Sequence, residues 1–130
     1  MEGFELYDNQ SISKVVNKIT ITKNYLINFP SAFYRINKLE NAKCVLLYFK
    51  RSTNQIAIKF LKSYDERGFK ISGSDRLHSG GYITAKNFFA VNGLVGEIRT
   101  GRYDYSNVKI RENGFDYDDL FVLQLEKIIN

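Results

Sequence analysis

Basic side chains are concentrated in the first half of this 130-residue chain. Between Lys14 and Lys62 there are ten Lys or Arg residues and one acid, Glu40, whereas from Asp65 onward nine bases face ten acids. A surface with many cations and almost no carboxylates is typical of proteins that bind nucleic acid or another polyanion. A coding bias toward Lys would instead leave these cations scattered over a solvated face.

Catalytic and metal-binding chemistry has little support in the sequence. The only histidine, His78, lies in a Gly/Ser-rich loop, and the only cysteine, Cys44, lies in an apolar strand, so no His/Cys metal set exists. The chain has neither a phosphate-binding loop nor a G-x-S-x-G nucleophile motif. Four carboxylates that could form a hard-cation site have the spacing of no known loop: Asp104, Asp116, Asp118 and Asp119. We therefore expect no enzyme, no metal and no cofactor.

The setting of the protein is indicated by its cysteine content and its hydropathy. A single Cys excludes an internal disulfide and favours a reducing, cytoplasmic compartment. No apolar run approaches the roughly 20 residues of a membrane span. The N-terminal "MEGFELYDNQ" lacks the apolar centre of a signal peptide.

The pattern of the first half predicts strands around one short helix. Asn24 is expected to take the left-handed conformation in the turn of a tight hairpin. Pro30, the only proline, ends the second strand and pre-sets the backbone for a helix, in which Phe33, Ile36 and Leu39 share one face. The expected elements are strands at 19–22, 25–29, 42–50 and 55–61, with the helix at 31–39.

The second half repeats this order more loosely. Thr84 is expected to cap its helix, and Gly93 to end it. An alternative for the C-terminus is a helix from Asp118 onward, but we favour a strand. The expected elements are strands at 68–72, 82–84, 96–105 and 120–125 and a helix at 85–92, with a loop at 73–81 and a long connection at 106–119.

Two segments carry the same strand–turn–helix phrase. "YLINFPSAFYRINKL", residues 25–39, aligns without a gap with "GYITAKNFFAVNGL", residues 81–94. The alignment sets Phe33 over Phe88 and Leu39 over Leu94. We therefore expect two structural repeats, with Phe33 and Phe88 in equivalent core positions.

The first of these units resembles the swapped-hairpin family of AbrB, SpoVT and MraZ transcription regulators. The resemblance covers about 15–61: Lys23 at the first turn, "YLINFP" as the strand into Pro30, Arg35 in the helix, and "CVLLYFKRSTNQIAIKFL" as the last two strands. It implies a mainly β fold with short helices (α+β), in which two repeats interleave into one β-barrel-like unit. We expect an N-terminal arm at 1–12, a basic first repeat at 13–63 and a divergent second repeat at 64–130. The repeats would pair within one chain or, in a homodimer, between two chains.

The function that follows from the resemblance and the charge is binding of duplex DNA, as a cytoplasmic transcription regulator or as an antitoxin with a toxin partner. Lys and Arg near the turns would neutralise phosphates, and Arg35 would reach a base edge. The alternative is an interaction or structural module, for example of a phage or mobile element, that does not bind DNA. The rings interleaved with bases also permit stacking on single strands, although most of them are expected in the core. The predicted DNA-binding residues are Lys14, Lys18, Lys23, Arg35, Lys38 and Lys43.

Overall fold

The computed structural model describes residues 18–73, 80–109 and 119–128. The expected arm at 1–12, Lys14 and His78 lie outside these residues. The predicted fold class is confirmed at the level of mostly β structure, with two antiparallel sheets and two short helices among the described residues. The strands are β1 (Ile19–Ile21), β2 (Leu26–Phe29), β3 (Cys44–Lys50), β4 (Gln55–Leu61), β5 (Phe69–Lys70), β6 (Gly81–Thr84), β7 (Gly101–Tyr103), β8 (Ser106–Lys109) and β9 (Asp119–Gln124), and the helices are α2 (Ser31–Asn37) and α3 (Lys86–Val91).

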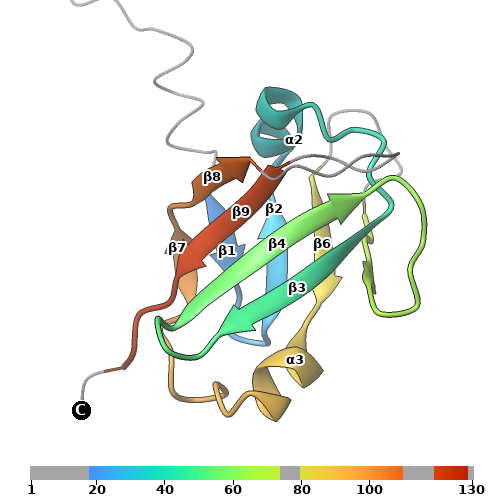
Figure 1. Ribbon diagram of the computed structural model, residues 1–130. Coiled ribbons are helices and arrows are strands. Elements are labelled where there is room, and N and C mark those ends of the chain that lie inside the picture. The colour runs from blue at the N-terminus through green and yellow to red at the C-terminus, as the bar shows by residue number, and fades with distance from the viewer. Residues whose placement is uncertain (1–17, 74–79, 110–118, 129–130) are drawn as a thin grey trace, which may run out of the picture.

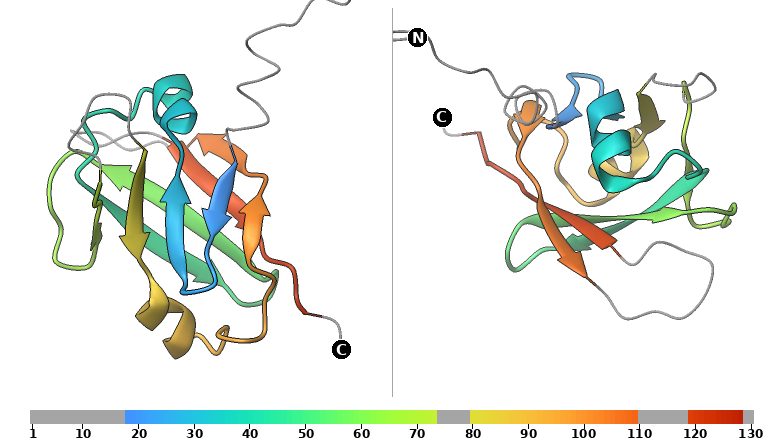
Figure 2. Two further views of the ribbon diagram at one scale, coloured as in Figure 1. Left: turned by 180° about the vertical axis from the view of Figure 1, so that it is seen from behind. Right: turned by 90° about the horizontal axis from the view of Figure 1, so that it is seen from above.

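The two sheets face each other, and their strands cross obliquely (Figure 1). The four-stranded sheet has the order β6-β2-β1-β7, and the five-stranded sheet the order β5-β3-β4-β9-β8. The helices lie at opposite ends of the sheets, with α2 at one end and α3 at the other, as the view from behind also shows (Figure 2). We call these the α2 end and the α3 end.

One apolar core fills the space between the sheets. Alternate residues of β1 and β2 point inward from one sheet, and alternate residues of β4 and β9 point inward from the other. Phe33 of α2 lies among them, with its ring centroid 4.9 Å from that of Phe121 and 5.7 Å from that of Phe60. The core therefore joins residues from both halves of the chain.

The part of the chain that the structure describes does not form the expected closed barrel, because the strand pairing is interrupted at two corners. Asp104 and Tyr105 separate β7 in one sheet from β8 in the other. On the opposite side, one isolated bridge between Ser72 and Tyr82 is the contact that links β5 to β6. Neither corner carries a continuous ladder, so the strands form two sheets rather than one closed barrel.

Two local predictions are wrong in detail. In the first hairpin the left-handed residue is Tyr25, with φ 62°, rather than Asn24. The Tyr25 hydroxyl accepts a 2.7 Å hydrogen bond from the Gly96 amide, and its ring lies 5.1 Å from that of Phe89, so tertiary contacts hold it there. The N-cap of α3 is Ala85 rather than Thr84, and the chain has no side-chain cap at that point.

The expected helix face is also partly wrong. Pro30 is the N-cap of α2, as expected, and Phe33 and Leu39 are fully buried, but Ile36 is half-exposed. Since α2 has only two turns and crosses the end of the sheets, its first turn packs on the core while Ile36 faces solvent. The corresponding Val91 of α3 is 80% exposed for the same reason.

The two helix–turn segments have the same hydrogen bonds, 55 residues apart. The Leu39 amide donates to the Tyr34 carbonyl at 2.9 Å, and the Leu94 amide to the Phe89 carbonyl at 2.8 Å. The Asn37 and Asn92 side chains each donate to the carbonyl four residues earlier. Both turns contain a left-handed residue, Lys38 with φ 57° and Gly93 with φ 69°. The backbone thus follows the gapless alignment.

Burial of the aligned rings differs between the two segments. Phe33 is fully buried, whereas its counterpart Phe88 is only partly buried and packs at the edge of the core. The fully buried ring of α3 is Phe89, which aligns with Tyr34. Equivalent backbone positions therefore do not have equivalent surroundings.

Corresponding strands of the two halves pair with each other. In the four-stranded sheet β2 pairs antiparallel with β6, so that Ile27 lies opposite Ile83. In the five-stranded sheet β4 pairs antiparallel with β9, with Ala57 opposite Val122. The C-terminal segment is thus a strand, as favoured, and the alternative helix from Asp118 is not formed at 119–124.

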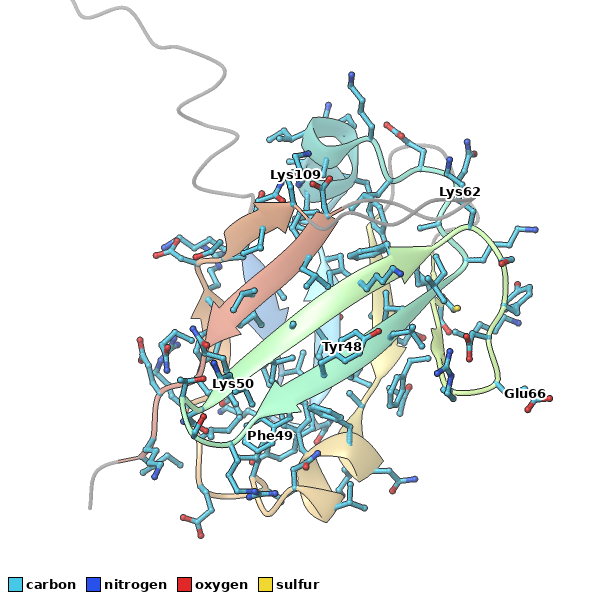
Figure 3. All side chains as sticks on the ribbon, viewed as in Figure 1. Tyr48, Phe49, Lys50, Lys62, Glu66 and Lys109 are labelled. Carbon is cyan, nitrogen blue, oxygen red and sulfur yellow. The ribbon has the colours of Figure 1, made fainter. Side chains whose placement is uncertain are left out.

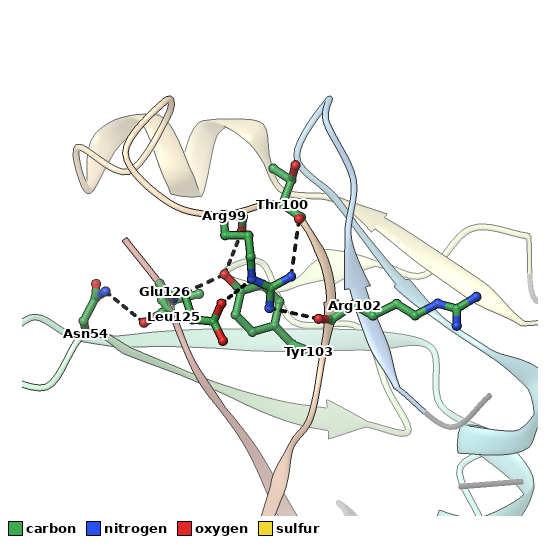
Figure 4. A network of polar contacts seen from close by, with 7 residues as sticks. All are labelled: Asn54, Arg99, Thr100, Arg102, Tyr103, Leu125 and Glu126. Atoms are coloured by element: carbon green, nitrogen blue, oxygen red, sulfur yellow. Dashed lines mark hydrogen bonds and ion pairs between the residues drawn. The ribbon is translucent and has the colours of Figure 1, made fainter. Parts of the chain in front are cut away.

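An ion pair and hydrogen bonds hold the residues after β9 against the segment before β7. Arg99 forms an ion pair with Glu126, and its guanidinium donates to the Arg102 carbonyl at 3.0 Å and lies 4.2 Å from the Tyr103 ring centroid (Figure 4). The Tyr103 hydroxyl donates to the Arg99 carbonyl at 2.6 Å. Arg99 is therefore a structural residue, whereas the Arg102 guanidinium points away from this network (Figure 4).

Candidate nucleic-acid interface

Three lysines that are far apart in the sequence line one groove at the α2 end. The groove has a volume of about 540 Å³, and we call it the lysine groove. The residues that line it are Glu40, Asn41, Ala42, Lys43, Lys62, Tyr64, Lys70 and Ile71. Glu40 is the one carboxylate among these eight, so the groove carries a net positive charge.

Strand register explains why these lysines meet. Cys44, the first residue of β3, pairs with Leu61 of β4 on one side and with Lys70 of β5 on the other. Lys43 precedes Cys44 and Lys62 follows Leu61, so the three lysines occupy neighbouring positions on three adjacent strand ends. Neighbouring strands lie about 4.8 Å apart, so their backbones span roughly 10 Å.

The backbone on which Lys43 stands is held on both sides. The Lys43 amide donates to the Leu61 carbonyl at 2.8 Å, and the Lys43 carbonyl accepts from the Ile71 amide at 3.1 Å. Its Nζ lies 5.8 Å from the centroid of the exposed Tyr64 ring. The groove therefore combines fixed cation positions with one accessible aromatic ring.

Two further predicted residues stand at the same end, on and just after α2. Arg35 lies in the last turn of the helix and Lys38 is its C-cap; both side chains are exposed. Neither makes a hydrogen bond or ion pair through its side chain with the described residues. Figure 3 shows Lys62 near this end of the molecule and Lys50 toward the opposite end.

The remaining described candidates, Lys18 and Lys23, lie outside the lysine groove. Lys18 precedes β1 and pairs with Asp104, with Nζ 3.2 Å from the carboxylate. Lys23 lies exposed in the β1–β2 turn, two residues before Tyr25, whose carbonyl accepts a hydrogen bond from the Ala85 amide at the start of α3. Lys18 and Lys23 therefore flank β1 at opposite ends of the sheet, and Lys14 lies outside the described residues.

Sequence reasoning did not select Lys62, Tyr64 or Lys70. Lys62 belongs to the basic first half, so the charge pattern contained a signal for it. Lys70 belongs to the predicted second repeat and is recognised only from its pairing opposite Cys44. The lysine groove thus contains residues from both halves of the chain. The boundary between the basic and the balanced half of the sequence therefore does not divide the protein surface into a basic and a balanced part.

Other site types have less support. Within residues 18–73, 80–109 and 119–128 no group of three or more His, Cys, Asp or Glu side chains is placed to hold a metal. Asp116 and Asp118, part of the carboxylate alternative, lie outside these ranges. Cys44 is buried, and its thiol contacts the Ser63 carbonyl at 3.3 Å. Neither described helix has the length and apolarity that crossing a membrane requires.

Comparison with known proteins adds no relative: no protein-family model matches the chain, and neither a curated protein nor a solved structure does.

Proposed function

We propose that the protein binds duplex DNA through its α2 end and acts, without catalysis, as a transcription regulator or antitoxin of the AbrB-like type. The observation that carries the proposal is the lysine groove, in which Lys43, Lys62 and Lys70 converge with a single carboxylate, Glu40. Arg35 and Lys38 extend this basic surface along α2. Together these five cations form what we call the basic end.

The AbrB-like part of the proposal is supported by the internal repeat. The shared hydrogen bonds after α2 and α3, 55 residues apart, are the pattern expected of a duplicated strand–helix unit. The pairing of β2 with β6 and of β4 with β9 is what interleaving of two such units within one chain requires. Each unit alone would expose the edges that these pairs cover, and a unit of that size buries too little surface to be stable.

Phosphate neutralisation is the chemistry that the basic end offers. A duplex has one negative charge per about 1.7 Å along its axis, so lysines on strand ends whose backbones span roughly 10 Å can face several phosphates at once. Each neutralised phosphate contributes about −0.9 to the slope of log affinity against log salt concentration. Arg35, with its forked guanidinium on an exposed helix face, is the residue best suited to reach a guanine edge.

The test is a salt titration of binding to labelled random-sequence duplex DNA. The wild-type protein is compared with the triple variant Lys43→Ala, Lys62→Ala and Lys70→Ala. Loss of three phosphate contacts should flatten the slope by about 2.7 units and weaken binding of all sequences alike.

A matched control removes the same charge at the opposite end of the molecule. Lys50, Lys86 and Lys127 are exposed lysines of the described chain outside the lysine groove, and their triple alanine variant has the same net charge as the test variant. It should retain most of the slope. Equal losses in the two variants would mean that the affinity comes from net charge rather than from the basic end.

One observation favours the alternative, an interaction module without DNA binding. The outer face of the five-stranded sheet exposes Tyr48 and Val108, and Tyr48, Ala57 and Val122 line an apolar hollow of about 220 Å³. An exposed apolar surface is typical of protein contacts. Absence of duplex affinity at low salt would overturn the DNA proposal in favour of the interaction module.

A further inference from the structure

A second groove, with none of the lining residues of the lysine groove, lies on the outer face of the four-stranded sheet. Its volume is also about 540 Å³, and we call it the sheet groove. The residues that line it are Lys18, Thr20, Asn28, Phe29, Pro30, Gly73, Gly80, Gly81, Tyr82 and Arg102. It contains two cations, an amide and an exposed ring, and none of its lining residues is a carboxylate.

The strand register orders these groups in a row. Thr20 pairs with Arg102 of β7 on one side and with Asn28 of β2 on the other, and Asn28 pairs with Tyr82 of β6. Because paired residues point to the same face, the row runs guanidinium, hydroxyl, amide, phenol across all four strands. With strands about 4.8 Å apart, the row is roughly 14 Å long.

Glycines line the part of the groove near Tyr82, and one of them lies beside its ring. Gly73 has φ 76°, and a Cβ there would lie 3.3 Å from the Tyr82 ring. A Cβ on Gly80 would lie 2.3 Å from the Phe29 carbonyl oxygen, and one on Gly81 would lie 2.6 Å from the Tyr34 hydroxyl. The Gly80 and Gly81 positions thus border the β2 backbone and the inner face of the sheet, so only at Gly73 does a missing side chain leave room beside the Tyr82 ring, which is 38% exposed.

The cations are at the other side of the groove. Arg102 is exposed, its carbonyl is held by Arg99, and its guanidinium points away from that network (Figure 4). Lys18 is held by Asp104, whose side chain is 86% exposed. Solvent-exposed pairs of this kind contribute little, so a phosphate can displace the carboxylate.

We propose that the sheet groove binds a segment of single-stranded nucleic acid. A base stacks on Tyr82, the Asn28 amide hydrogen-bonds a base edge, and backbone phosphates lie on Arg102 and Lys18. Single strands are recognised by this combination, since every base has a face for stacking and a charged backbone beside it. In a duplex the faces of the bases are stacked on one another, so no base face is available to stack on Tyr82. The inference is independent of the lysine groove and of the duplex proposal.

The test is fluorescence anisotropy with a labelled oligonucleotide of about 12 nucleotides, a length within the site sizes known for single-strand binding domains. Tyr82→Ala should weaken binding about 5- to 150-fold, the range for loss of one base–aromatic stack. Tyr82→Phe should bind like the wild type, because stacking needs the ring and not the hydroxyl. Arg102→Gln should flatten the salt slope by about 0.7, the value for one phosphate of a single strand.

Two control variants show whether single-strand binding depends on the sheet groove. Tyr48→Ala removes a similarly exposed tyrosine from the outer face of the other sheet and should leave single-strand binding unchanged. The triple lysine-groove variant should also retain it, so failure of the duplex proposal and failure of this one are distinguishable. Equal losses from Tyr48→Ala and Tyr82→Ala, no loss from Tyr82→Ala, or no binding at low salt would overturn the proposal.

Competition identifies the source of the ligand. An unlabelled single strand should displace the probe, and a mononucleotide should do so far more weakly, because it offers one base and one phosphate. If a mononucleotide competes equally well, the ligand of the sheet groove is a free nucleotide, and the proposal of a polynucleotide ligand is overturned. If Tyr82→Ala does not fold, as judged by circular dichroism, Tyr82→Leu and Arg102→Gln give the same decision.

Discussion

Phe33 and Phe88 are equivalent in the sequence alignment of the two segments, but we expect them to contribute unequally to the stability of the protein. Phe33→Ala removes a fully buried ring with neighbours in both sheets, including Phe29 of β2 at 5.7 Å and Phe121 of β9 at 4.9 Å between ring centroids. Transfer of such a side chain from water contributes about 1.5–3 kcal/mol. The enclosed cavity that remains adds to this, so the expected loss of unfolding free energy is about 3–5 kcal/mol.

Phe88→Ala should cost much less. This ring is only partly buried, and apart from its chain neighbour Phe89 its aromatic contacts are distant, with centroids 6.4 Å from Phe69 and 6.5 Å from Phe49. Because the Phe88 ring is partly exposed in the folded protein, its burial contributes only part of the transfer free energy. The space that the ring would leave is open to solvent, so no sealed cavity forms. The expected loss is about 1–2 kcal/mol, from half the transfer term and little cavity term. Phe89→Ala, at the fully buried ring, should resemble Phe33→Ala instead.

Urea unfolding followed by circular dichroism measures both losses, with the urea slopes compared to verify that the unfolded states are alike. Val91→Ala is the matched control on the exposed face of α3 and should change stability by less than about 0.5 kcal/mol. A loss below about 1 kcal/mol for Phe33→Ala, or equal losses for Phe33→Ala and Phe88→Ala, would refute the packing described above.

Four other outcomes are expected. Tyr34→Phe should leave the free energy of unfolding in urea unchanged or raise it by up to about 1 kcal/mol, because the buried Tyr34 hydroxyl has no hydrogen-bond partner among the described residues. A loss of more than about 1 kcal/mol would show that the hydroxyl does have a hydrogen-bond partner. Arg99→Met should lose about 1–2 kcal/mol, since it removes charged hydrogen bonds that are partly exposed, and Arg99→Lys should not restore them; unchanged thermal unfolding would contradict this. Hydrogen bonds from the Arg67 side chain, and to a lesser degree from the Arg67 amide, lower the pKa of Asp65 to about 2. The stabilisation that this pair provides is therefore present above the ordinary pKa of 3.8 and is lost as the pH falls toward 2. A titration of the carboxyl group by NMR should show the low pKa, and Arg67→Ala should return it toward 3.8. Light scattering should give a monomer of about the chain mass of 15.1 kDa, because β2 pairs with β6 and β4 with β9 inside one chain, and a stable dimer would show that further strand edges pair between chains.

Much of the strand pattern could be predicted from the sequence. Alternating apolar residues in "QIAIKFL" and "LFVLQL" point into the core at every second position, as β4 and β9 confirm. Pro30 marks the start of α2 because its missing N–H and fixed φ favour a helix start. These predictions succeed because they depend on neighbours in sequence.

The failures have a common origin in contacts between distant segments. Tyr25 rather than Asn24 is left-handed because Gly96 and Phe89 bind its side chain. Ile36 is exposed although it has helical spacing with Phe33, because nothing in the described chain covers the last turn of α2. Periodicity predicts which residues share a face, but it does not predict how far the covering sheet extends.

The mostly β character of the protein, the gapless alignment of its two helix–turn segments and the basic character of its first half could all be predicted from the amino-acid sequence alone. Which cations lie together depends on the tertiary structure. Lys43, Lys62 and Lys70 meet because β3 pairs with both β4 and β5, and Arg102, Asn28 and Tyr82 align because four strands have a common register. Local patterns result from steric and hydrophobic preferences within a few residues, whereas a binding surface depends on pairing between segments that only the packed core brings together.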